Sequence, residues 1–217
     1  MKVIKVIGRI ILLAILLVLS PFVGLVSYPV DSNSNAAFSL LVVEVILATL
    51  FVIAVTAIIY WILLRKKLFQ LFTDNHWSYK VILYAAIMIC LVLLTMLASG
   101  IPHQGLYKDL VNITGFGDPK LQYFFIIISG VLAPIAEELY FRGLIFTYVR
   151  NISNVTVAII VSSIFFGLAH SFVNPYIFIS HAVVSIFIGL SRQKSNGMIV
   201  PIIMHMIWNL LIFALIL

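Results

Sequence analysis

Long apolar runs separated by short polar turns are the feature that most limits how this chain can fold. A helix of about 20 mostly apolar residues is long enough to cross the hydrocarbon core of a bilayer, and most of the runs are near or above this length. The runs lie at about Ile7 to Val30, Ala36 to Leu64, Tyr79 to Ser99, Phe124 to Arg150, Val155 to His170, Tyr176 to Leu190, and Met198 to the C-terminus. The sequence therefore predicts an all-α, polytopic transmembrane helical bundle of about seven spans.

Composition supports a membrane protein and excludes other classes. The 217 residues are 64% hydrophobic and only 9% charged, and the mean hydropathy is +1.22, far outside the range of a soluble globular domain. The net charge of +6 comes from sparse bases between apolar runs, so we predict no nucleic-acid site. The single cysteine, Cys90, excludes an internal disulfide and a cysteine-rich metal site.

The loop bases predict how the chain is oriented in the cell membrane. The first run has a basic start but is too long for a signal peptide, so we expect it to remain as a span. With a cytoplasmic N-terminus and an external C-terminus, the bases on the cytoplasmic side are Lys2, Lys5, Arg9, Arg65, Lys66, Lys67, Lys80, Arg150, Arg192 and Lys194. The other side receives only Lys108 and Lys120. In this interpretation Arg192 to Gly197 is a polar turn, and Gly100 to Leu121 is an external loop with a solvated His103.

The run from Phe124 to Arg150 carries three ionisable side chains in an otherwise apolar helix: Glu137, Glu138 and Arg142. An ionisable group at the bilayer centre costs about 2.5 to 3.5 kcal/mol on insertion scales, so such groups usually mark a pathway or a reactive site. Glu138 and Arg142 are spaced i,i+4 and can neutralise each other on one helix face. Glu137 lies about 100° around the helix and must face something else. Pro134 predicts a kink just before the acidic pair.

The other candidates for chemistry are polar residues of the last three runs: His170, His181, His205 and Asn209. Counted from the nearest turns at 1.5 Å per residue, Glu137 and His170 lie roughly 20 and 25 Å deep, and His205 and Asn209 roughly 11 and 17 Å deep. The fourth and fifth helices form a hairpin, and the last helix can bring His205 and Asn209 toward it on one face. We therefore expect a carboxylate, two imidazoles and an amide to converge, with His181 left as a packing residue or interhelical hydrogen-bond donor.

These residue types fit peptide hydrolysis. A glutamate in an apolar site can act as general base on water, a histidine can share the proton transfer, and amide or imidazole donors can stabilise an oxyanion. The chain has no H-E-x-x-H motif and no serine in a G-x-S-x-G context. Two histidines and a glutamate could in principle hold zinc, but we expect no cofactor. Asn209 alone could also be an interhelical contact.

Three motifs resemble one known family. They are EELYFR at Glu137 to Arg142, FGLAH at Phe166 to His170, and HMIWN at His205 to Asn209. Together they resemble the E-E-x-x-x-R, F-x-x-x-H and H-x-x-x-N signatures of the CAAX protease and bacteriocin-processing family, also called the Abi family. The resemblance implies an intramembrane, metal-independent endopeptidase related to the type II CAAX prenyl endopeptidases. It also implies that Glu137 and His170 activate water, that His205 and Asn209 line the oxyanion hole, and that Glu138 and Arg142 support the site.

The resemblance covers about residues 121–217, and we predict this part to be the catalytic core, preceded by membrane helices and an external loop in residues 1–120. The expected partners are membrane lipids and a peptide or lipidated protein substrate. The sequence sets neither the cleavage site nor the oligomeric state. Two other functions stay open: a non-catalytic membrane protein of the bacteriocin self-immunity type, and a proton or ion conduit.

Overall fold

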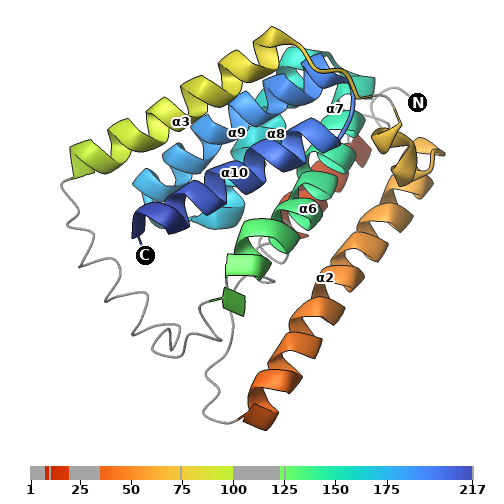
Figure 1. The fold of residues 1–217 in the computed structure, drawn as a ribbon. Coiled ribbons are helices and arrows are strands. Elements are labelled where there is room, and N and C mark those ends of the chain that lie inside the picture. Colours follow the sequence, from red (N-terminus) through yellow and green to blue (C-terminus); the bar gives the residue numbers. More distant parts are fainter. Residues whose placement is uncertain are drawn as a thin grey trace.

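The described part of the chain consists of helices joined by short turns in the computed structural model (Figure 1), which describes residues 8–9, 11–19, 35–73, 75–99, 123–124 and 126–216. The long helices are α2 (Asn35–Leu64), α3 (Tyr79–Ser99), α8 (Val155–His170), α9 (Pro175–Ser195) and α10 (Ile199–Ile216). A 3₁₀ turn, η2 (Leu68–Phe72), follows α2. The all-α fold is confirmed for these residues, and the five long helices follow the predicted runs closely.

Two helices are long and apolar enough to cross a membrane by length and composition, Val42–Leu64 and Pro175–Ser195. Shorter apolar helices cover Tyr79–Leu91, Val155–His170 and Ile199–Ala214. In the first predicted run, the described residues 8–9 and 11–19 are helical, and the rest of that run lies outside the described residues. The predicted external loop with His103 also lies outside them. The total of seven spans thus stays a prediction.

The predicted fourth helix is divided into four helical pieces. A π-helical turn, η3 (Ile128–Leu132), leads into α6 (Ala133–Glu138), and a second π-helical segment, η4 (Leu139–Ile145), leads into α7 (Phe146–Ile152). Pro134 sits in the first turn of α6, where its missing N–H is least costly. Farther on, the Thr147 hydroxyl donates to the carbonyl of Arg142 at 3.4 Å. The acidic pair thus lies between two π-helical segments, which often occur at functional sites.

This composite helix is the centre of the bundle. Residues 136–149 are all buried, and the buried aromatic rings of Phe141, Phe146 and Phe166 belong to the core around them. Figure 1 shows α3, α8, α9 and α10 grouped together, with α6 between that group and α2. The Tyr140 hydroxyl also donates to the carbonyl of Leu16 at 2.5 Å, which ties the N-terminal helical residues to η4.

Apolar side chains remain exposed on the outer helices. On α2 more than half of the surface is exposed for Val43, Leu47, Leu50, Phe51, Ile58 and Trp61. A surface this apolar is costly in water and favourable in hydrocarbon. The exposed apolar faces and the spanning-length helices agree with the predicted membrane protein.

The segment between α2 and α3 closes one end of the bundle. Asn75 accepts a hydrogen bond from the backbone N–H of Ile199 at 3.0 Å, and the N–H of His76 donates to the carbonyl of Ser195 at 2.8 Å. A side chain on Gly197 would collide with the Asn75 side chain, so glycine there leaves room for Asn75 to reach the start of α10. The cap of α10 therefore comes from a segment more than 120 residues away.

The prediction that Arg192 lies in a polar turn is wrong. Helix α9 continues to Ser195 and ends at Asn196, whose φ of 57° is left-handed. Arg192 is only 2% exposed inside this helix. The polar residues from Arg192 onward are typical of a loop. The first four of them instead continue α9 by one helical turn, to Ser195.

Candidate active site

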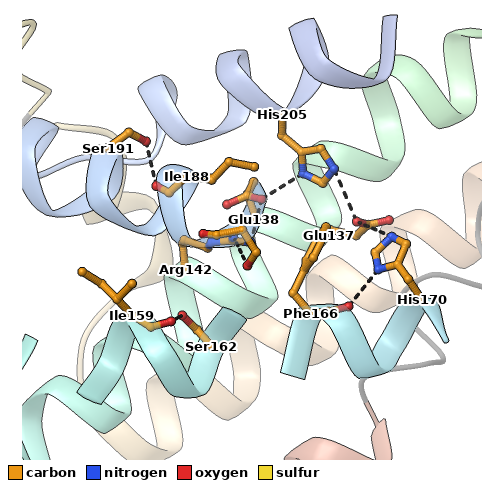
Figure 2. Close-up of polar contacts among 11 residues, drawn as sticks. Glu137, Glu138, Arg142, Ile159, Ser162, Phe166, His170, Ile188, Ser191 and His205 are labelled. Atoms are coloured by element: carbon orange, nitrogen blue, oxygen red, sulfur yellow. Dashed lines mark hydrogen bonds and ion pairs between the residues drawn. The ribbon is translucent and has the colours of Figure 1, made fainter. Parts of the chain in front are cut away.

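The two glutamates of α6 are both buried and meet different partners. Glu138 is fully buried and Glu137 is 4% exposed. Adjacent residues on a helix point about 100° apart, which separates the two carboxylates. Figure 2 shows Glu138 toward Arg142 and His205, and Glu137 toward His205 and His170.

Glu138 is the centre of a buried polar network. Arg142 Nη1 donates to Glu138 Oε1 at 2.9 Å, so the predicted i,i+4 pair is present. The other terminal nitrogen of Arg142 donates to the carbonyl and the hydroxyl of Ser185 on α9, at 2.9 and 2.6 Å. The guanidinium also lies 5.0 Å from the centre of the Phe166 ring. Charge-assisted bonds and a ring contact thus hold a buried arginine between three helical elements.

His205 links the two glutamates. Its Nδ1 lies 2.9 Å from Glu138 Oε1, and its Nε2 lies 3.7 Å from Glu137 Oε2. A carboxylate accepts, so Nδ1 carries the proton in the Glu138 bond. This bond fixes the ring so that Nε2 faces Glu137.

His170 approaches Glu137 from α8 in the same manner. Its Nδ1 donates to the carbonyl of Phe166 at 2.8 Å, and its Nε2 lies 3.8 Å from Glu137 Oε2. The predicted approach of Glu137 and His170 is therefore present. His170 is also the more accessible imidazole, because 23% of its side chain is exposed against 1% for His205.

Glu137 Oε2 is buried and makes no hydrogen bond with the described residues. Both imidazole Nε2 atoms face it at distances longer than a hydrogen bond. With both Nδ1 atoms protonated, three groups that can accept a proton point at one another. A proton or a water molecule shared among them would relieve the repulsion, which is the arrangement that general acid–base chemistry needs.

The sequence prediction missed the place of His181. Its ring stacks on that of His170, with centroids 4.2 Å apart and planes at 23°, while its Nδ1 lies 2.8 Å from the carbonyl of Ile177. Trp208 meets the His181 ring edge to face at 5.2 Å. Only four residues connect α8 to α9, so the start of α9 must lie beside the end of α8. This short connection is the sequence signal that could have placed His170 and His181 together.

Gly167 allows that stack to form. A Cβ there would lie 2.7 Å from the carbonyl oxygen of Phe178 and 3.0 Å from the Cβ of Ala182. Helices α8 and α9 therefore approach closely one turn before the histidines. Close backbone approach of this kind is a use of glycine in membrane helices.

Asn209 does not join the carboxylate and the imidazoles. It lies one turn beyond His205 on α10, as predicted, but its Nδ2 donates to the carbonyl of Ser129 in η3 at 2.7 Å. This bond joins α10 to the π-helical turn that precedes the acidic pair. Three of the four groups expected to converge are thus together, and the amide binds elsewhere.

The donors of this cluster are of the types that zinc binds. Yet no group of three or more His, Cys, Asp or Glu side chains in the described part of the chain is arranged to hold a metal ion. As they are placed here, these side chains do not fit a zinc site.

Comparisons with known proteins agree with the motifs. Residues 119–211 match the family described as type II CAAX prenyl endopeptidase Rce1-like. The chain is also 35% identical over 83 residues to the UPF0177 protein YxdF of Lactococcus lactis subsp. lactis (strain IL1403), a match that covers 38% of this chain and 45% of that protein. The chain thus spans under half the length of this curated relative. No solved structure gives a significant match.

Proposed function

Because residues 119–211 belong to the CAAX protease family, we propose that this protein is an intramembrane endopeptidase of the glutamate type. Its substrate would be a membrane-associated or lipidated peptide or protein. The observation that carries the proposal is Glu137 Oε2, which is buried, makes no hydrogen bond with the described residues, and faces the Nε2 atoms of His170 and His205.

Glu137 would take a proton from the attacking water as its oxygen bonds to the peptide carbonyl carbon. His170 is the exposed member of the cluster, so it is suited to pass a proton to the leaving amine. Its Nδ1 is held by the Phe166 carbonyl, which keeps Nε2 available for that transfer. The proton removed from water can thus reach the amine within one cluster.

His205 would stabilise the oxyanion. The Glu138 carboxylate holds Nδ1 and aims Nε2 into the site, where Nε2 donates to the oxyanion when it carries a proton. Arg142 and Ser185 hold the Glu138 side of the network in place. The family resemblance also assigns Asn209 to the oxyanion hole, a role in which its amide would have to release the Ser129 carbonyl.

The proposed architecture is a multi-pass bundle of about seven spans with a cytoplasmic N-terminus and an external C-terminus. Residues 1–120 would supply the first membrane helices, and residues 121–217 the catalytic core. No metal takes part in the proposed reaction. The cluster of Glu137 with His170 and His205 favours catalysis over the self-immunity alternative, because a binding protein does not need a buried carboxylate that faces two ordered imidazoles.

Cleavage by the purified full-length protein tests the proposal. We would compare a farnesylated CAAX peptide with the same peptide lacking the lipid, and detect the products by mass spectrometry. Wild type should cut at least the lipidated peptide, and Glu137→Gln should not, because the amide cannot take a proton from water. Cleavage by Glu137→Gln at the wild-type rate would remove Glu137 from the mechanism. Inhibition by a chelator that added zinc reverses would favour a metal enzyme.

A membrane proteome comparison would name the substrate. Cells that produce wild type and cells that produce Glu137→Gln contain the same amount of folded protein if only chemistry is lost. New protein termini found only with wild type would identify the cleaved bond. A phenotype that Glu137→Gln retains in full would favour the non-catalytic binding function.

A further inference from the structure

Arg192 is a second buried arginine, and it lacks the partners that Arg142 has. It lies in the last turn of α9 and is 2% exposed. Its Nε and Nη1 atoms are buried and have no hydrogen-bond partner among the described residues. The guanidinium lies 5.8 Å from the centre of the Phe146 ring. A ring face is a weak partner for a charge that has lost its water.

Arg142 shows how the fold neutralises a buried arginine. It has a carboxylate from Glu138 and two acceptors from Ser185. Ser185 and Arg192 lie on the same helix, about 10 Å apart along its axis. The same bundle thus holds one buried arginine with a carboxylate partner and one for which the described residues supply none, and an unpaired buried charge is strongly destabilising.

The charged neighbour of Arg192 is another cation. Arg150, at the exposed end of α7, lies with its guanidinium 5.8 Å from the same Phe146 ring. The groups that act electrostatically on Arg192 are Arg150 and the phenol of Tyr60, with no carboxylate among the described residues. Two guanidiniums therefore lie at the Phe146 ring, near enough to the Tyr60 hydroxyl for both charges to act on it.

We propose that Arg192, Arg150 and Tyr60 form a binding site for a phosphate-type oxyanion. Such an anion accepts several charge-assisted hydrogen bonds at once, which suits guanidinium forks better than a single carboxylate. The phosphate comes from a lipid headgroup or from solution. The site lies at helix ends, at the level where headgroups lie if these helices span the membrane. This proposal does not depend on the proposed peptidase activity.

Thermal unfolding of the full-length protein in neutral detergent tests the site. The probes are phosphatidylglycerol against phosphatidylcholine, and inorganic phosphate against chloride at equal ionic strength. The variants are Arg192→Met, Arg150→Gln and the control Lys194→Gln, which removes an exposed base two residues from Arg192. A ligand that binds only the folded state raises the melting temperature, and its concentration dependence gives the affinity.

Wild type and Lys194→Gln should be stabilised by phosphatidylglycerol, and affinity should fall about tenfold or more in Arg192→Met and less in Arg150→Gln. Stabilisation by inorganic phosphate as well identifies a site for the free anion, and stabilisation by the lipid alone identifies a headgroup site. Without any probe, Arg192→Met should melt at or above the wild-type temperature, because it removes an unpaired buried charge. The absence of any stabilisation of wild type, or equal losses in Lys194→Gln, would overturn the proposal. If Arg192→Met does not fold, an Arg150→Gln protein that binds as wild type does would overturn it.

Discussion

The imidazole Nδ1 of His205 lies 2.9 Å from Oε1 of Glu138, a residue 67 positions earlier in the chain. Through this bond the last helix is fixed against the acidic pair, and the other ring nitrogen is aimed at Glu137. Glu138 Oε1 therefore accepts from two partners, the Arg142 guanidinium and the His205 imidazole.

Glu138→Gln should reduce both stability and activity. Removing one partner of a buried ion pair typically costs about 3–5 kcal/mol, because the other charge stays buried without compensation. The change also removes the carboxylate that accepts from His205 Nδ1 and orients its ring. We expect a lower yield and a lower melting temperature in detergent, measured beside Glu137→Gln, which should melt near wild type. A Glu138→Gln protein as stable and as active as wild type would contradict the network described here.

The variant Asn209→Ala distinguishes two roles of this residue, an oxyanion donor and an interhelical hydrogen bond. Loss of one oxyanion donor lowers turnover about 10²- to 10³-fold with little effect on KM. Loss of the bond to Ser129 should cost about 0.6 kcal/mol, the average for interhelical hydrogen bonds in a membrane. We expect kcat to fall strongly, KM to stay near wild type and the melting temperature to fall slightly. Normal turnover in a destabilised protein would leave Asn209 with the structural role alone.

His181→Ala should lower turnover by loosening His170, and His181→Phe should retain most of it. The stack of the two rings is worth about 0.5–1.5 kcal/mol, so loss of orientation alone predicts a decrease of about two- to tenfold in kcat. Phenylalanine keeps a flat ring but cannot exchange a proton. His181 could act by orienting the His170 ring or by transferring a proton, and kcat for both variants distinguishes these roles. A proton-transfer role would make His181→Phe as impaired as His181→Ala.

The orientation of the chain can be tested apart from the site. Reporter fusions after Lys67 and after Gly197 should give cytoplasmic activity, and a fusion near Gly105 should give external activity, because basic loops stay on the cytoplasmic side. A reporter fused to the full-length chain keeps every helix and serves as the control for membrane insertion. The reverse pattern of reporter activity would overturn the proposed topology.

Helix positions and the local ion pair were determined by the sequence itself. Apolar runs and polar turns predicted the bounds of α3 and α8 to the residue, since helix ends follow from local composition. The i,i+4 spacing predicted the pair of Glu138 and Arg142 because neighbours on one helix face are set by the helix repeat alone. The approach of Glu137 and His170 was also predicted. In a helical hairpin, residues at similar distances from the turn lie side by side.

Only the tertiary structure decided which contacts form between helices. The stack of His181 on His170 depends on close approach at Gly167, and the bond from Asn209 to Ser129 depends on the rotation of α10 against η3. The polar residues around Arg192 predict a turn, whereas the structure places Arg192 inside α9 against Phe146. The rotation and depth of one helix against another follow from many side chains packing at once, whereas sequence spacing reports only the faces of each helix by itself.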